Sequence, residues 1–211
     1  MNPTLFDIET EPLPLEILIP RMPEFNAPSN YKDADKIKAS IEAQKQSWLE
    51  DAALSPMTGR VLVFGYLNNG QFDVVADEDE SILLKMAWEI IDSCISTGNE
   101  LVGFNCNSFD LPFMVRRSWA SNVKIPKAVG SGHGRYWNWS EQIINLRTIW
   151  QLGNRQDEGS LDSISKFFGQ AGKSGSGKDF AALWKSDRPK AILYLQNDLN
   201  LTASLYAKMM A

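Results

Sequence analysis

The segment Leu5-Phe6-Asp7-Ile8-Glu9-Thr10 begins the chain with a strand-like run that two acids interrupt. Residues two positions apart on a β-strand leave the same face, so the carboxylates of Asp7 and Glu9 are expected side by side. Two acids on the buried face of a strand are costly unless cations neutralise them. On the solvated face, the same pair is an ordinary strand-end feature. The Asp-x-Glu pattern occurs only once in the chain, and both interpretations are open at this point.

A proline-rich stretch, residues 11–58, separates this strand from the next one. Its charged part, residues 33–54, has apolar residues at helical spacing, so we expect an insertion that carries one amphipathic helix. Two apolar runs, residues 60–67 and 72–76, then flank Asn68-Asn69-Gly70, which is a strong turn signal. The pattern predicts a β-hairpin directly after the insertion.

The remainder of the chain alternates expected helices with short strands. Residues 81–97 have a helical apolar pattern with Ser81 as N-cap and Gly98 as stop. The order of elements predicts an α/β fold with a mixed sheet, organised as a single domain over residues 1–211 with an insertion at about 11–58. The further expected elements are a strand over 100–104, a helix from Leu111, an irregular segment over 121–140, a strand over 143–147, a helix over 160–168 capped by Ser160, a Gly/Ser/Lys loop over 173–178, a short helix through Trp184 capped by Asp179, and a last helix from Arg188 to Met210.

Composition limits what the chain can be. Of its 211 residues, 44% are hydrophobic and 22% charged, which is typical of a globular protein and excludes a wholly disordered chain. The net charge of −5 argues against a broad basic face for duplex nucleic acid, but not against a nuclease whose carboxylates carry cations. No segment approaches the roughly 20 apolar residues of a membrane span, and no signal peptide is visible. We therefore expect a soluble, cytoplasmic protein with no membrane partner.

Two further acids fall at informative places. Tyr194 and Asp198 are four residues apart on the last expected helix and share a face, so the aspartate needs a partner there. Asp110 is expected between a strand end and a helix start. It is either the N-cap of that helix or a ligand-binding acid, because α/β sheets place their ligands at such points. The apolar residues expected on the inward face of the last helix are Ala191, Leu195, Leu201, Thr202 and Leu205.

Three motifs, residues 5–10, 103–110 and 194–198, resemble in order those of the DnaQ-like 3′–5′ exonucleases of the tyrosine (DEDDy) subgroup. Residues 105–113 are most similar to the proofreading exonuclease domains of family B DNA polymerases and their stand-alone relatives. The histidine subgroup has a histidine where this chain has Leu193. The resemblance implies a ribonuclease H-like fold, with a mixed central sheet flanked by helices and an inserted segment after the first strand.

The resemblance also implies an activity. It is that of a metal-dependent 3′–5′ exonuclease, which hydrolyses phosphodiester bonds at the 3′ end of single-stranded or frayed nucleic acid and releases nucleoside monophosphates. DNA is favoured over RNA as substrate. Four carboxylates would hold two Mg²⁺ or Mn²⁺ ions, which hard oxygen ligands suit, and a tyrosine would orient the attacking water. These residues are Asp7, Glu9, Asp110, Asp198 and Tyr194.

By the same resemblance, Thr10, Asn105 and Phe109 lie beside the terminal nucleotide, although Phe109 is equally a candidate for the core. Basic residues alternate with aromatic ones between positions 110 and 139, which suits a single strand held by charge and stacking, and we expect Arg135 to contribute. The alternative for this stretch is a solvated helix face with packed tryptophans.

Two alternatives concern the loop and the function. Residues 172–178 have the G-x4-G-K spacing of a phosphate loop, but Asp179 replaces the required Ser or Thr, so we expect only a loop near the cleft. A catalytically silent DnaQ-like module that binds a nucleic-acid end or a partner is the alternative function. The insertion at 11–58 would be the contact surface for a replication or repair protein.

Overall fold

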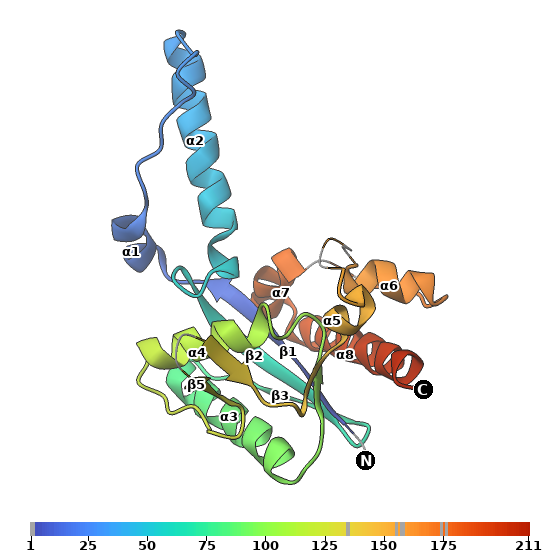
Figure 1. The fold of residues 1–211 in the computed structure, drawn as a ribbon. Helices are drawn as coiled ribbons and strands as arrows, with labels where there is room; N and C mark the ends of the chain where they lie inside the picture. Colours follow the sequence, from blue (N-terminus) through green and yellow to red (C-terminus); the bar gives the residue numbers. More distant parts are fainter. Residues whose placement is uncertain (1–2, 134–135, 155, 157–158, 174, 176) are drawn as a thin grey trace. The chain divides into compact units, whose positions relative to one another are not determined.

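The computed structural model describes residues 3–133, 136–154, 156, 159–173, 175 and 177–211 (Figure 1). The chain divides into two compact units. The first, here called the sheet unit, contains Met1–Glu9 and Val61–Ala211. The second, called the insertion unit, contains Thr10–Arg60.

A mixed sheet forms the centre of the sheet unit. Within the described residues it has five strands in the order β3-β2-β1-β4-β7. β1 pairs in parallel with β4, β4 pairs in parallel with β7, and β2 and β3 form the expected antiparallel hairpin. The α/β class and the mixed sheet predicted from the sequence are therefore confirmed. The strands are β1 (Thr4–Pro12), β2 (Gly59–Asn68), β3 (Gln71–Val75), β4 (Leu101–Gly103) and β7 (Ile143–Asn145).

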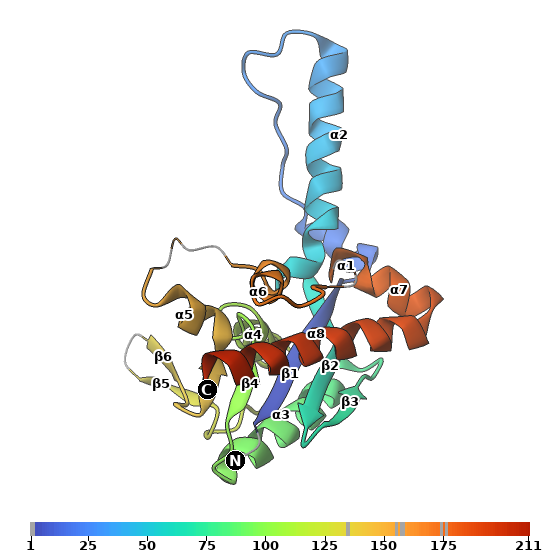
Figure 2. The same cartoon turned by 90° about the vertical axis from the view of Figure 1, so that its right-hand side faces the viewer.

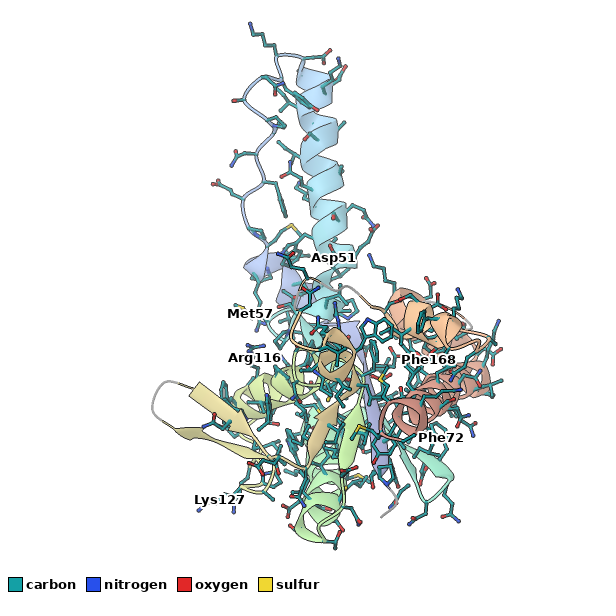
Figure 3. The ribbon with its side chains drawn as sticks, turned by 45° about the vertical axis from the view of Figure 1, so that its right-hand side comes forward. Asp51, Met57, Phe72, Arg116, Lys127 and Phe168 are labelled. Carbon is teal, nitrogen blue, oxygen red and sulfur yellow. The ribbon has the colours of Figure 1, made fainter. Side chains whose placement is uncertain are left out.

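Helices cover both faces of this sheet (Figure 2). One face packs against α3, where Trp88 and Ile91 are fully buried with Phe64 of β2. The other face packs against α8 through Leu199 and Leu205, which share a cluster with the sheet residues Leu5 and Val102, among others. Phe72 and Phe168, labelled in Figure 3, pack against the α8 cluster. The helices of this unit are α3 (Glu80–Ser96), α4 (Asp110–Ala120), α5 (Leu146–Gln151), α6 (Leu161–Phe167), α7 (Phe180–Ser186) and α8 (Arg188–Met209).

The start of α3 differs from the prediction. The N-cap is Asp79, whose carboxylate accepts the backbone N–H of Ser81 at 2.8 Å, so Ser81 is not the cap. The helix starts earlier because an aspartate two residues upstream already satisfies the first free N–H groups. The end is as predicted, since Gly98 follows the helix with φ of +81°, a conformation that glycine adopts without strain.

Three other local predictions need correction. The expected irregular segment over 121–140 contains a hairpin, in which β5 (Gly130–His133) pairs with β6 (Tyr136–Trp139). The glycines of β5 hid this strand, because glycine is depleted in strands. β7 stops at Asn145, whose side chain caps the unexpected α5. Asp179 stands at the N-cap of α7 but makes no capping hydrogen bond through its side chain. The predicted caps and bounds of α6 and α8 are close to those observed.

The insertion unit contains the expected helix, α2 (Ala34–Glu50), capped by Asp33, and a short helix, α1 (Leu15–Leu18). Its small apolar cluster joins Leu13, Leu18 and Ala52. Trp48 and Leu49 at the end of α2 pack against that cluster, and no residue of α2 itself is fully buried. Among all described helices of the chain, none combines the length and apolar character required to cross a bilayer.

Candidate active site

The alternation of β1 decides where its acids lie. Phe6 and Ile8 join the core cluster on the α3 face, whereas Leu5 joins the cluster that contains Leu199 of α8. Residues two apart share a face, so Asp7 and Glu9 leave the strand on the α8 side with Leu5. The strand therefore directs both carboxylates toward the last helix.

The face of α8 that lies toward the two strand acids is a single buried stripe. Tyr194 is 6% and Asp198 1% exposed, as expected for residues four apart on the inward face. Leu193 is 55% exposed, so the position at which the histidine subgroup has its histidine turns away from this stripe. Leu201, predicted inward, is only half-buried, and Leu199 is buried instead. The buried residues of α8 are Ala191, Tyr194, Leu195, Asp198, Leu199, Thr202 and Leu205.

The strand and the helix bring three acids together. Carboxylate oxygens of Asp7, Glu9 and Asp198 all lie within 4.8 Å of one another. Glu9 is only 8% exposed and Asp7 is half-buried, so the pair does not lie on a solvated face of the strand. We call these three residues, together with Asp110, the acid cluster.

Asp110 joins the cluster from the start of α4. It is the first residue of that helix rather than its N-cap, which is Phe109 and makes no capping hydrogen bond through its side chain. The buried Asp110 carboxylate accepts the backbone N–H of Ile8 on β1 at 3.1 Å. Asp110 also lies close to Asp7, whose pKa its negative charge raises. The helix start thus ties its acid to the strand that carries the other two.

Burial makes the charges of this cluster expensive. Burial raises the pKa of Asp7 well above its usual range, and the negative charges of Asp110, Glu9 and Asp198 raise it further. Burial likewise raises the pKa of Glu9 to about 8 and that of Asp110 to about 6. Burial also raises the pKa of Asp198, although the nearby ammonium of Lys173 opposes the shift. The cluster therefore favours cations or bound protons at neutral pH.

Lys173 is a residue of this site that the sequence did not reveal. Its Nζ lies 2.5 Å from Oδ2 of Asp198 and 5.3 Å from the centre of the Tyr194 ring. Burial alone lowers the pKa of Lys173, but the charge of Asp198 more than offsets this, so the pKa lies above its usual range. Lys173 therefore stays charged and partly balances the acid cluster.

The glycine-rich loop that contains Lys173 lies against the site, as expected for a loop near the cleft. A Cβ added at Gly175 would lie 3.3 Å from the Tyr194 ring, and one at Gly177 would lie 3.8 Å from Glu9 Oε2. The small residues at these two positions permit this close approach. Its lysines were visible in the sequence, but which of them turns toward the acids depends on tertiary packing.

The expected substrate residues occupy different places. Asn105 has φ of +64°, and its Oδ1 accepts a hydrogen bond from Arg147 Nη1 at 3.3 Å. Phe109 is half-buried, with its ring 5.6 Å from that of Phe113, and packs against the core. Thr10 belongs to the insertion unit, where its hydroxyl donates to the Ala53 carbonyl at 2.7 Å. Arg135 lies outside the described residues.

Comparisons with known proteins agree with this architecture. A protein-family model described as "Predicted 3′-5′ exonuclease related to the exonuclease domain of PolB" matches residues 61–211. A search of curated proteins found no match. Among solved structures, the chain is similar to the family B DNA polymerase from the hyperthermophilic archaeon Pyrobaculum calidifontis, with a TM-score of 0.63 and 15% identity. That similarity covers 100% of this chain and 24% of the polymerase, so the chain spans about a quarter of the polymerase's length.

These comparisons bear on the fold predicted above. At 15% identity the structural likeness shows the fold, and it confirms the ribonuclease H-like α/β class. The family match begins at residue 61, so Asp110, Tyr194 and Asp198 fall within it, whereas Asp7 and Glu9 precede it. Asp7 and Glu9 nevertheless lie close to Asp198, which is inside the matched region.

Proposed function

Because the chain belongs to the family of predicted 3′–5′ exonucleases related to the exonuclease domain of PolB, we propose a specific reaction for it. The enzyme removes nucleotides from the 3′ end of single-stranded or frayed nucleic acid, with DNA favoured over RNA, and depends on divalent metal ions. The observation that carries this proposal is the convergence of three carboxylates, Asp7, Glu9 and Asp198, within 4.8 Å.

The residues present fit such metal ions. Their ligand atoms are carboxylate oxygens, which suit Mg²⁺ or Mn²⁺ better than zinc. Burial raises the pKa of Glu9 to about 8 even with the charge of Lys173 nearby, which supports a need for further positive charge at the acids. Asp110 beside Asp7 provides the fourth carboxylate for a pair of ions. Two bound ions would supply an activated water and stabilise the leaving oxygen.

Tyr194 is suited to orient the attacking water. Burial raises the pKa of its hydroxyl above the usual range, and the charge of Asp198 adds to the shift. The hydroxyl therefore keeps its proton near neutral pH and acts as a hydrogen-bond donor rather than as a base.

In the reaction, water adds to the phosphorus, the P–O3′ bond breaks, and the departing 3′ oxygen takes a proton. The products are a nucleoside 5′-monophosphate and a strand shortened by one nucleotide.

We further propose that the substrate residues expected from the sequence, Thr10, Asn105, Phe109 and Arg135, contact the terminal nucleotides. The position of Asn105 is consistent with this proposal, because Asn105 lines a cavity together with Lys173. Between positions 110 and 139, the basic residues Arg116 and Lys127, labelled in Figure 3, are exposed. Arg117 is occupied otherwise, because it pairs with Glu80.

The catalytically silent module is the alternative function. Against it, all five positions of the motifs carry a chemically competent residue, and four carboxylates meet at one site.

We also propose that residues 1–211 act as one exonuclease domain and that the insertion at 11–58 contacts a replication or repair protein. Exposed apolar side chains in this unit, Leu15, Ile19 and Met57, support a contact role.

A 5′-labelled oligonucleotide tests the activity directly, in DNA and RNA versions, with Mg²⁺, with Mn²⁺ and with chelator. Wild type is compared with Asp7→Ala and with the control Asp92→Ala on α3, across the sheet from the site. The proposal predicts a metal-dependent ladder that shortens from the 3′ end in wild type and Asp92→Ala and is absent in Asp7→Ala. If no protein cleaves and all bind 3′ ends equally, the silent module is the correct function.

A further inference from the structure

A polar cavity of about 490 Å³ adjoins the acid cluster within the sheet unit. It lies between the end of β4, the first turn of α5, the start of α6 and the glycine-rich loop. Of the described residues that line it, two are cationic, Arg147 and Lys173, and none is acidic. The lining residues are Phe104, Asn105, Arg147, Gly159, Ser160, Leu161, Ser163 and Lys173.

Arg147 is incompletely bonded in this cavity. Its Nη1 donates to Asn105 Oδ1 at 3.3 Å, which fixes one end of the guanidinium. Its Nε is buried and has no hydrogen-bond acceptor among the described residues. A buried donor without an acceptor costs free energy, so a ligand oxygen that reaches it would be bound favourably. The planar guanidinium presents paired N–H groups that match the oxygens of a phosphate.

The two cations of the cavity differ in their acidic partners: Lys173 has one, and Arg147 has none among the described residues. Lys173 Nζ faces Asp198, so the cavity meets the acid cluster through a lysine that is already paired. Asp162 lies next to the loop, where it accepts the Lys173 backbone N–H at 2.8 Å and pairs with Lys166 at 2.7 Å. Arg147 has no ion pair with any described acid. Its positive charge is therefore available to an anionic ligand.

From this arrangement we infer that Arg147 binds the phosphate immediately upstream of the scissile one, on its 5′ side. The inference rests on the proposed function, because it takes the acid cluster as the place of cleavage. The inference places the scissile phosphate at that cluster and the 5′ continuation of the strand in the adjoining cavity. Arg147 is a specificity-determining residue that makes the enzyme prefer a polynucleotide with an anionic second phosphate over a single-nucleotide ester.

Oligonucleotides with one altered linkage test this inference. A short single-stranded DNA carries a neutral methylphosphonate at the linkage one position upstream of the scissile bond, and its kcat/KM is compared with that of the unmodified strand. Wild type is expected to lose at least tenfold, equal to about 1.4 kcal/mol. Arg147→Gln and Arg147→Met, which both retain an unbranched stem, should cleave the two strands within about twofold of each other. The matched control Arg188→Gln, an exposed arginine stacked on Trp184, should keep the wild-type ratio.

Each outcome separates the inference from its premise. If wild type cleaves neither strand, the proposed function fails. If wild type cleaves and the Arg147 variants retain the tenfold ratio, the inference is wrong, and Arg147 only positions Asn105. Should neither variant fold, wild type alone decides: when the methylphosphonate is moved along the linkages upstream of the scissile bond, the loss in kcat/KM must be largest at the first of them, and an equal loss at each linkage overturns the inference.

The released nucleotide is the other source of a phosphate. Inhibition by free thymidine 5′-monophosphate should be unchanged by Arg147→Gln. Weaker inhibition in this variant, together with an unchanged methylphosphonate ratio, would assign the cavity to the product and overturn the inference.

Discussion

The sheet unit buries acidic side chains in two places, and they differ in how the charge is balanced. Glu80 at the start of α3 accepts the backbone N–H of Val61 at 2.8 Å, and its Oε2 lies 2.6 Å from Arg117 Nη2. Nε of Arg117 donates to the same carboxylate at 3.1 Å. The acid cluster instead gathers the three carboxylates of Asp7, Glu9 and Asp198 with Asp110 close to Asp7, and Lys173 is the cation paired with it among the described residues.

We interpret this difference as the difference between a structural ion pair and a functional site. A buried carboxylate with a bidentate arginine and a backbone donor is satisfied by the fold itself. Several buried carboxylates with one lysine are not, and such sites persist where a ligand completes them. The predictions below change one region at a time and ask whether the two respond as this comparison requires.

The largest effect is expected on catalysis in the acid cluster. Asp7→Asn removes one carboxylate and one of the charges that repel each other, so cleavage should fall by about 10³-fold or more while the metal-free protein unfolds no more easily. Initial rates on a labelled strand with Mn²⁺ measure cleavage. Urea unfolding of the metal-free protein measures stability. A variant with near wild-type rates would show that the cluster is not the reacting centre.

The next effect is expected on stability at the ion pair. Glu80→Gln leaves the Arg117 charge buried without its carboxylate, and such breaks lower the free energy of unfolding by about 3–5 kcal/mol. Cleavage per folded molecule should persist, because neither residue touches the acid cluster. Urea unfolding of Glu80→Gln and of Asp7→Asn under the same conditions compares their free energies of unfolding. If Asp7→Asn is the more destabilised protein, the two regions have been assigned the wrong way round.

A smaller effect is expected from pH in metal-free protein. Folding raises the pKa of Glu9 from 4.5 to about 8 and that of Asp110 from 3.8 to about 6, so between these values the folded state binds more protons than the unfolded state. Stability should therefore fall as pH rises through this window, by at most about 1.4 kcal/mol per pH unit for each proton. Chemical unfolding from pH 5 to 8 measures the slope, which should be shallower with Mn²⁺ bound. Stability that rises across this window would contradict the raised values.

Elements with strong periodicity could be predicted from the sequence. The four-residue spacing of Tyr194 and Asp198 placed both on the buried face of α8, and the alternation of β1 paired Asp7 with Glu9. These predictions succeeded because local geometry fixes which side chains share a face. The turn Asn69-Gly70 likewise specified the β2–β3 hairpin, since both residues adopt positive φ there.

Features set by contacts distant in sequence could not be predicted in the same way. The capping role considered for Asp110 was locally reasonable, but the partner of its carboxylate is the N–H of Ile8, 102 residues away. Lys173 stands in a loop without periodicity, and only the folded chain places it beside Asp198. Arg147 lies in α5, a helix that was not predicted because the strand expected over 143–147 extended into its first turn.

Metal binding tests the comparison most directly, through thermal unfolding of wild type, Asp7→Asn and Glu80→Gln with and without Mn²⁺. Binding to the folded state alone stabilises a protein by about 2.7 kcal/mol at a hundredfold excess over the dissociation constant. We predict that Mn²⁺ raises the melting temperature of wild type and Glu80→Gln and leaves that of Asp7→Asn nearly unchanged. An unmoved wild type, or an equal rise in Asp7→Asn, would contradict the account of the acid cluster as a metal site.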